Sequence, residues 1–217
     1  MKKNHLIFVG IALTLLAISC KKEKNVAFTN TSISSDYGKL AVGNYWVYEK
    51  YQVDSLGNTI GMVPGLDSCY IESDTNINGH IYFKMYKPHI MPSKVYSYLR
   101  DSADCIVNSS GEILFSKNNF SAPINLSFIM LTPTDTLCSV TTEMQDNNIL
   151  VTTGAGTFQT KNARQQYSFF PPWTSPIQTR NLNTRYSKDV GIVIDTREFF
   201  SGDYYLIEKR LIRYHVN

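Results

Sequence analysis

Cys20 is the residue whose surroundings in the sequence point most directly to chemistry. Lys2 and Lys3 and then an apolar run over residues 6–18 precede it, and the small residue Ser19 stands immediately before it. The run is long enough for the core of a signal peptide but shorter than the roughly 20 residues of a membrane-spanning helix. A thiol is a good nucleophile toward a lipid donor, and a small preceding residue gives a peptidase access to the bond before it. The alternative is an ordinary signal peptide with an incidental cysteine.

The stretch from Leu16 to Cys20 resembles the lipobox of bacterial lipoproteins, in the looser form with Ala17 three places before the cysteine. The resemblance implies that residues 1–19 are removed, that the Cys20 sulfur receives a diacylglycerol, and that the new amino group is acylated. Several acyl chains make a firm membrane anchor, whereas one chain binds only marginally. In Gram-negative relatives, Lys21 in place of Asp implies the outer membrane. In some such bacteria, surface-export signals are acidic just after the cysteine. Residues 21–24 hold only one acid, so the resemblance favours the periplasmic face over the cell surface.

The charge balance excludes one class of partner. Removing residues 1–19, which carry two lysines and no acid, leaves 198 residues and lowers the formal charge from +3 to +1. Near-neutral charge with interspersed signs argues against nucleic acid. A chain of this size buries about 70% of its unfolded surface in one core, so one domain is the default.

Residues 74–79 match the first half of a calcium-binding loop, with Asp74, Asn76, Asn78 and Gly79 at the right spacing. Such a loop also needs a bidentate carboxylate at its twelfth position, where this chain has Met85. Asn-Gly is a common hairpin turn, because glycine tolerates a positive φ. We therefore predict a turn here, and neither a metal site nor a cofactor. The glycine-containing residues 154–161 lack the ending of a phosphate-binding loop and are expected to turn into a strand.

Catalytic patterns are missing from the sequence. His80, His89 and His215 lie in unrelated contexts, and no Gly-x-Ser-x-Gly elbow occurs. Paired acids such as Glu72 and Asp74 are expected beside turns, and glycosidase carboxylates cannot be identified without geometry. We therefore do not expect an enzyme. The alternative is an envelope hydrolase that acts on glycan or peptide.

Three cysteines remain after Cys20, namely Cys69, Cys105 and Cys138. An oxidising compartment permits a disulfide, but the odd number leaves one thiol over, and the sequence does not select among the pairings. No Cys-x-x-Cys occurs, so neither a zinc knuckle nor a thioredoxin-type redox site is supported.

Aromatic residues crowd two places, residues 45–51 and residues 169–176. Trp46, Phe170 and Trp173 are the candidates for an apolar rim that holds a hydrophobic ligand, since the double proline after Phe170 would stiffen a projecting loop. The alternative reading of these side chains is core packing beneath a rigid loop.

The elements that must position these residues are strands. Residues 20–39 are rich in Ser, Thr and Asn and are expected to form the lipidated N-terminus and a flexible tether. From residue 40 to residue 217, β-branched and aromatic runs alternate with turn residues, without convincing helical periodicity. We predict a single, mainly antiparallel all-β domain with a strongly curved sheet or half-barrel. The alternative is a two-sheet β-sandwich.

A second resemblance rests on residues 40–48, the Gly-Thr-Phe of 156–158, and residues 185–193 before a final strand. This layout resembles uncharacterised lipoproteins of Gram-negative bacteria and, more distantly, the LolA/LolB-like lipoprotein carriers. The resemblance implies a curved sheet around an apolar cavity and supplies no catalytic residues. The long helix that fills the concave face of the carriers has no counterpart in this sequence.

These observations favour a lipid-anchored envelope protein with a non-catalytic binding or structural β domain. Its expected partners are the membrane, through the N-terminal lipid, and a hydrophobic ligand or an envelope protein. The envelope hydrolase remains the alternative, and converging titratable groups in a pocket would support it.

Overall fold

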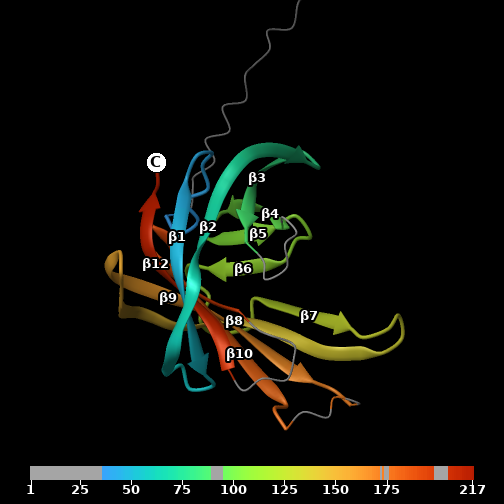
Figure 1. The fold of residues 1–217 in the computed structure, drawn as a ribbon. Coiled ribbons are helices and arrows are strands. Elements are labelled where there is room, and N and C mark those ends of the chain that lie inside the picture. The colour runs from blue at the N-terminus through green and yellow to red at the C-terminus, as the bar shows by residue number, and fades with distance from the viewer. Residues whose placement is uncertain (1–35, 89–94, 172, 174–175, 198–204) are drawn as a thin grey trace, which may run out of the picture. The chain divides into compact units, whose positions relative to one another are not determined.

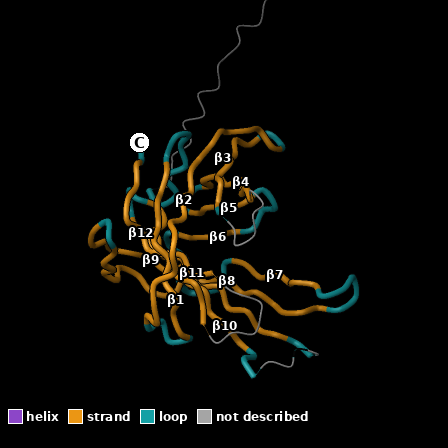
Figure 2. Tube along the Cα trace, in the orientation of Figure 1, coloured by secondary structure: helices purple, strands orange, loops and turns teal. Residues whose placement is uncertain are grey.

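The computed structural model describes residues 36–88, 95–171, 173, 176–197 and 205–217. These residues form twelve strands and no helix (Figures 1 and 2). The strands are β1 (Tyr45–Asp54), β2 (Thr59–Ile77), β3 (His80–Lys87), β4 (Val95–Ser102), β5 (Cys105–Asn108), β6 (Ile113–Ser116), β7 (Asn125–Met130), β8 (Thr136–Thr153), β9 (Gly156–Phe169), β10 (Thr179–Ser187), β11 (Gly191–Arg197) and β12 (Tyr205–His215).

All twelve strands belong to one antiparallel sheet. Its order is β6-β5-β4-β3-β2-β1-β12-β11-β10-β9-β8-β7. Strands consecutive in sequence are neighbours in the sheet except β6 and β7, which form its two edges, and β1 pairs with β12. Figure 1 shows β1, β2 and β12 running side by side. The prediction of an all-β, antiparallel, strongly curved sheet is confirmed. The two-sheet sandwich is not formed, because a single sheet holds every described strand.

The sheet curls until it is nearly closed into a barrel. Phe115 of β6 lies with its ring centroid 4.5 Å from that of Tyr186 in β10. The Ser116 amide, also on β6, donates to the Met144 sulfur of β8 at 3.4 Å. Register shifts along β2 and β8 supply part of the curvature, since a bulge bends its strand and increases the local twist.

The folded unit begins earlier than the predicted residue 40. Tyr37 is buried, and its ring centroid lies 5.1 Å from that of Phe115. Residues 36–39 therefore pack on the sheet instead of ending a tether, because an aromatic side chain at this point gains apolar contact on β6. The rest of the predicted signal and tether, residues 1–35, lies outside the described residues.

The predicted turn between β2 and β3 is confirmed. Asn78 and Gly79 both have positive φ, of 51° and 82°, which suits a tight two-residue hairpin. The Asn76 side-chain oxygen accepts a bond from the Gly79 amide at 2.9 Å and so caps the turn. Gly154 and Ala155 likewise join β8 to β9, as predicted for a turn that leads into a strand.

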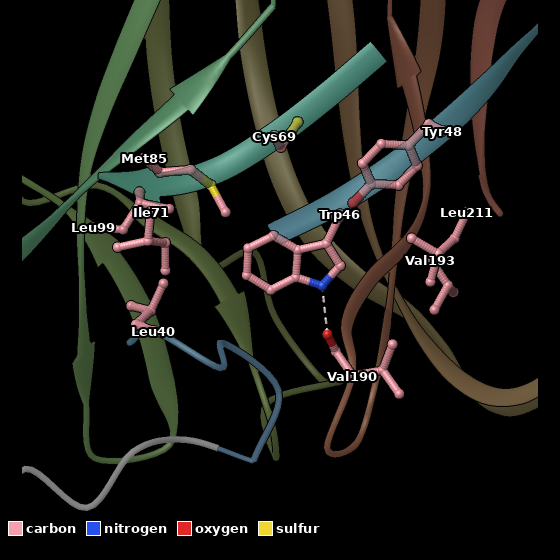
Figure 3. Close-up of a cluster of buried hydrophobic side chains, with 10 residues drawn as sticks. All are labelled: Leu40, Trp46, Tyr48, Cys69, Ile71, Met85, Leu99, Val190, Val193 and Leu211. Carbon is pink, nitrogen blue, oxygen red and sulfur yellow. Dashed lines mark hydrogen bonds between the residues drawn. The ribbon is translucent and has the colours of Figure 1, made fainter. Parts of the chain in front are cut away.

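The apolar core centres on Trp46, which is 1% exposed (Figure 3). Its indole nitrogen donates to the Val190 carbonyl at 2.7 Å, and the Tyr48 hydroxyl donates to the Ile192 carbonyl at 2.9 Å. Gly191 lets the β10–β11 turn approach the indole, since it has φ +96° and an added Cβ would come 3.2 Å from the Trp46 nitrogen. These bonds tie β1 to β11 across the interior.

Candidate functional site

The sequence-predicted rim residues lie in three different settings. Trp46 is a core residue that has no exposed surface to offer a ligand. Phe170 is 39% exposed, whereas Trp173 is half-buried and stacks on Phe169 with ring centroids 4.5 Å apart. The Trp173 indole nitrogen donates to the Ile177 carbonyl at 3.1 Å. The structure therefore brings Phe170 and Trp173 together in one loop and separates them from Trp46. Cys20, the predicted lipid attachment point, lies outside the described residues.

The apolar interior has little free space among the described residues. The cavity beside Trp46, Tyr48, Met85 and Tyr186 measures about 20 Å³. That volume is close to the minimum for one water molecule and far below the 300–1,000 Å³ or so of ligand pockets. The apolar cavity implied by the resemblance to lipoprotein carriers is therefore filled by aromatic and aliphatic side chains.

Exposed apolar side chains gather instead on β7, which ends the sheet. Leu126, Phe128 and Met130 are all about half exposed and alternate along the strand, so they share one face. The prediction of a hydrophobic partner is not tested by these residues and stays a prediction.

The three described cysteines form no disulfide with one another. Cys69 and Cys138 are buried and Cys105 is half-buried, on three different strands. Burial raises the pKa of the Cys69 thiol to about 11, against an opposing effect of Lys209 and Lys87. At neutral pH this thiol is therefore protonated and a poor nucleophile.

A network of charged side chains from β1, β2, β11 and β12 lies beside Cys69. Lys209 is buried and its ammonium lies 2.6 Å from Asp67, which Lys50 also approaches at 3.5 Å. Asp195 pairs with Arg197 at 2.5 Å and raises the pKa of that guanidinium. Because each buried charge has an opposite partner, we read this network as structural.

An open cleft of about 310 Å³ lies among the described residues. Its walls come from β1, the turn after β1, and the strands β8 to β12, so strands distant in sequence meet there. Its lining is mostly polar, with amide, guanidinium and carboxylate side chains. The lining residues are Val53, Asp54, Ser55, Leu56, Gly57, Gln145, Asp146, Asn162, Arg164, Asn181, Asn183, Arg185, Thr196, Leu206 and Glu208.

A break in strand alternation helps to build this cleft. Asn162 and Arg164 on β9, and the residues of β10 opposite them, follow the normal period of two. On β8, however, the consecutive residues Gln145 and Asp146 both line the cleft. They lie in the register shift between Met144 and Asn147, where the pairing with β9 is interrupted. A bulge re-aims side chains in this way.

Charges in the cleft are matched. Arg185 donates to both carboxylate oxygens of Asp146, each at 3.0 Å, and Arg164 pairs with Glu143. The Glu208 carboxylate accepts from the Arg210 guanidinium at 2.7 Å. The bidentate Arg185–Asp146 pair holds both of its side chains in one geometry. The walls are therefore positioned before any ligand arrives.

The Asp54 carboxylate at the cleft mouth is held by the turn that follows β1. It accepts from the Asn58 side chain at 2.9 Å and from the Asn58 and Leu56 amides at 2.8 and 2.9 Å. These hydrogen bonds, with that of the Asn58 side chain first, lower the pKa of Asp54. The carboxylate stays charged at neutral pH and is committed to the turn.

Three buried polar atoms of the lining residues have no hydrogen-bond partner within the described chain. They are Asn162 Oδ1, Arg164 Nε and Thr196 Oγ1, and Asn162 and Thr196 are only 3% and 4% exposed. Asn162 does use its amide nitrogen, which donates to Asn183 Oδ1 at 2.8 Å. An unsatisfied buried polar group costs about 1–3 kcal/mol, and three of them at one cleft call for an explanation.

Sequence reasoning did not find this cleft. The signal was present as alternating polar residues in β9 and β10, but any solvent-facing side of a strand has the same pattern. The described residues hold no group of three or more His, Cys, Asp or Glu side chains that could bind a metal ion. They also contain no helix long and apolar enough to cross a bilayer.

No protein-family model matches the chain, and no curated protein matches it by sequence. Two crystal structures are similar to it. One is a protein of Bacteroides fragilis NCTC 9343, classed as exported and with a YmcC-like fold. It has 11% sequence identity and a TM-score of 0.45, covering 82% of this chain and 98% of that one. The other, from Parabacteroides distasonis ATCC 8503, is classed as a lipoprotein. It has 13% identity and a TM-score of 0.39, covering 84% of this chain and 99% of that one.

Proposed function

We propose that this chain is a lipid-anchored envelope protein whose β domain binds a small polar molecule in the cleft and does not convert it. The anchor is Cys20, at the periplasmic face of the outer membrane, as the sequence predicts. The observation that carries the binding role is the cleft of about 310 Å³ with walls already held by ion pairs.

The size and lining of the cleft support a polar ligand better than an apolar one. Its volume lies at the lower end of the range for ligand pockets, about 300–1,000 Å³. The interior cavity beside Trp46, which an apolar ligand would need, is more than tenfold smaller.

The state of the carboxylates supports binding without catalysis. Asp146 and Glu208 are held by guanidiniums, and Asp54 is held by its turn. The hydrogen bonds that lower the pKa of Asp54 also make it a poor general acid. Neither histidine nor cysteine is among the described lining residues.

Attachment is tested by metabolic labelling. Labelled palmitate should enter the wild-type protein and not Cys20→Ala, which should become soluble in the periplasm. Equal labelling of the two proteins would refute the anchor and leave the cleft untouched.

Binding is tested by NMR on the ¹⁵N-labelled full chain with a panel of small polar molecules: maltose, cellobiose, digalacturonic acid, dialanine and glycerol 3-phosphate. At least one should shift the side-chain amide signals of Gln145, Asn181 and Asn183. Panel-wide silence at these amides would overturn the binding role.

A further inference from the structure

We infer that the cleft takes a neutral, hydroxyl-rich ligand, that is, a short saccharide. This inference rests on the proposed binding function and names the class of ligand. It follows from the charges, the amides and the few apolar side chains of the cleft.

The charges of the cleft argue against an ionic ligand. Among the described lining residues, Arg164 and Arg185 carry positive charge, and Asp54, Asp146 and Glu208 carry negative charge, for a balance of −1. Both guanidiniums are already bound to carboxylates. An anion would therefore have to share these guanidiniums with Glu143 or Asp146, and a cation would have to compete with Arg185, Arg210 or the Asp54 turn.

The amides argue for hydroxyl groups. Gln145, Asn181 and Asn183 line the cleft, the first two exposed and the third half-buried. Each amide offers two N–H donors and a carbonyl acceptor. A hydroxyl group also both donates and accepts hydrogen bonds. A row of amides can therefore pair with a row of hydroxyls so that every donor and acceptor has a partner and neither side carries a charge.

The apolar part of the lining fits the same ligand class. Val53, Leu56 and Leu206 are its aliphatic members, of which Val53 is buried, Leu206 is half-buried and Leu56 is largely exposed. A sugar ring has C–H faces between its hydroxyls, which Leu56 and Leu206 can cover. A peptide of mixed sequence would instead need apolar pockets for its side chains, and the lining here is mostly polar.

Isothermal titration on the lipidated full chain tests the inference, in an amine-oxide detergent because this carries no sugar. The probes are maltose and cellobiose, with digalacturonic acid, dialanine and glycerol 3-phosphate as comparisons. We expect a neutral disaccharide to bind at least tenfold more tightly than each comparison.

Two variants test whether the disaccharide binds in the cleft. Gln145→Ala combined with Asn181→Ala should weaken disaccharide binding at least tenfold without lowering the melting temperature, because both side chains are exposed. Gln159→Ala is the matched control. Gln159 is an exposed amide on β9 outside the cleft, and its loss should change the affinity by less than twofold.

The outcomes separate the two proposals. If only an acidic or peptide probe binds and the double variant loses it, the ligand class is wrong and the binding function stands. If disaccharide binds equally to the wild type and the double variant, the saccharide inference is wrong. If no probe binds, both proposals fail.

Discussion

The interior around Trp46 and the cleft around Asn162 use the same sheet in opposite ways. In the interior, aromatic and aliphatic side chains leave about 20 Å³ empty, and the indole and Tyr48 hydroxyl have carbonyl partners. In the cleft, about 310 Å³ is open, charges are paired across strands, and three buried polar atoms have no partner within the described chain.

The difference shows where stability is gained and where it is given up. Buried apolar area and satisfied polar groups stabilise the interior, whereas unsatisfied polar groups destabilise the cleft. A region selected for stability alone would rarely keep unsatisfied buried polar groups. We therefore expect binding in the cleft.

Trp46→Ala should produce the largest loss. Removing a fully buried indole costs about 3–5 kcal/mol, because contacts are lost and a cavity remains. Urea unfolding of the full chain measures this loss. Trp173→Ala is the matched control, and because Trp173 is half-buried we expect about 1–2 kcal/mol. Equal losses at the two positions would erase the contrast between interior and loop.

Cys69 tests how tightly the interior is sealed. With its pKa raised from 9.0 to about 11, its thiolate population at pH 8 is about a hundredfold below that of an ordinary thiol. We expect Cys105, which is half-buried, to be alkylated by iodoacetamide while Cys69 and Cys138 are not. Mass spectrometry of the digested protein measures this.

The pH dependence of that labelling has a defined sign. The folded-state pKa is raised, so the Cys69 thiolate increases with pH up to about 11, and any labelling should rise by about tenfold per pH unit from 8 to 10. Rapid labelling of Cys69 at pH 8 would show that the interior opens.

Arg185→Ala tests whether the cleft walls are held by ion pairs. The pair with Asp146 is bidentate and half-buried, so we expect a loss of about 1–2 kcal/mol. Lys188→Ala, which removes a more exposed contact with Asp36 at 3.7 Å, should cost less than about 0.5 kcal/mol. Urea unfolding of both variants gives the comparison, and a neutral Arg185→Ala would mean that the walls do not depend on this pair.

Thr196→Val should have a small effect of the opposite sign. The valine is nearly the same size, and the hydroxyl it removes is buried without a partner among the described residues. We therefore expect a gain of about 0.5–1 kcal/mol in the free energy of unfolding. A loss of similar size would show that the hydroxyl is satisfied in solution, and the contrast between the two regions would weaken.

Much of the fold could be predicted from the sequence, because strand patterns and turns are local. Asn78-Gly79 forms its hairpin through positive φ at two adjacent residues, which needs no tertiary contact. The sequence predicts Trp46 at a rim, but this residue lies in the core. That prediction is wrong because the sequence pattern of a strand does not show which face of the sheet is covered. Tyr37, in a polar segment, was predicted in the tether, and its burial depends on Phe115 about eighty residues away.

By itself the sequence determined the all-β class, the antiparallel hairpins and the lipobox-like residues before Cys20. Only the tertiary structure decided that the edge strand β6 meets β10 at Phe115 and Tyr186, and that β1 and β8 to β12 enclose a polar cleft. The physical reason is the sequence separation over which each kind of interaction acts. Alternation and turn chemistry act over a few residues, whereas the partner of Asp146 is Arg185, 39 residues away, and only the curvature of the sheet brings the β1 turn to the same place.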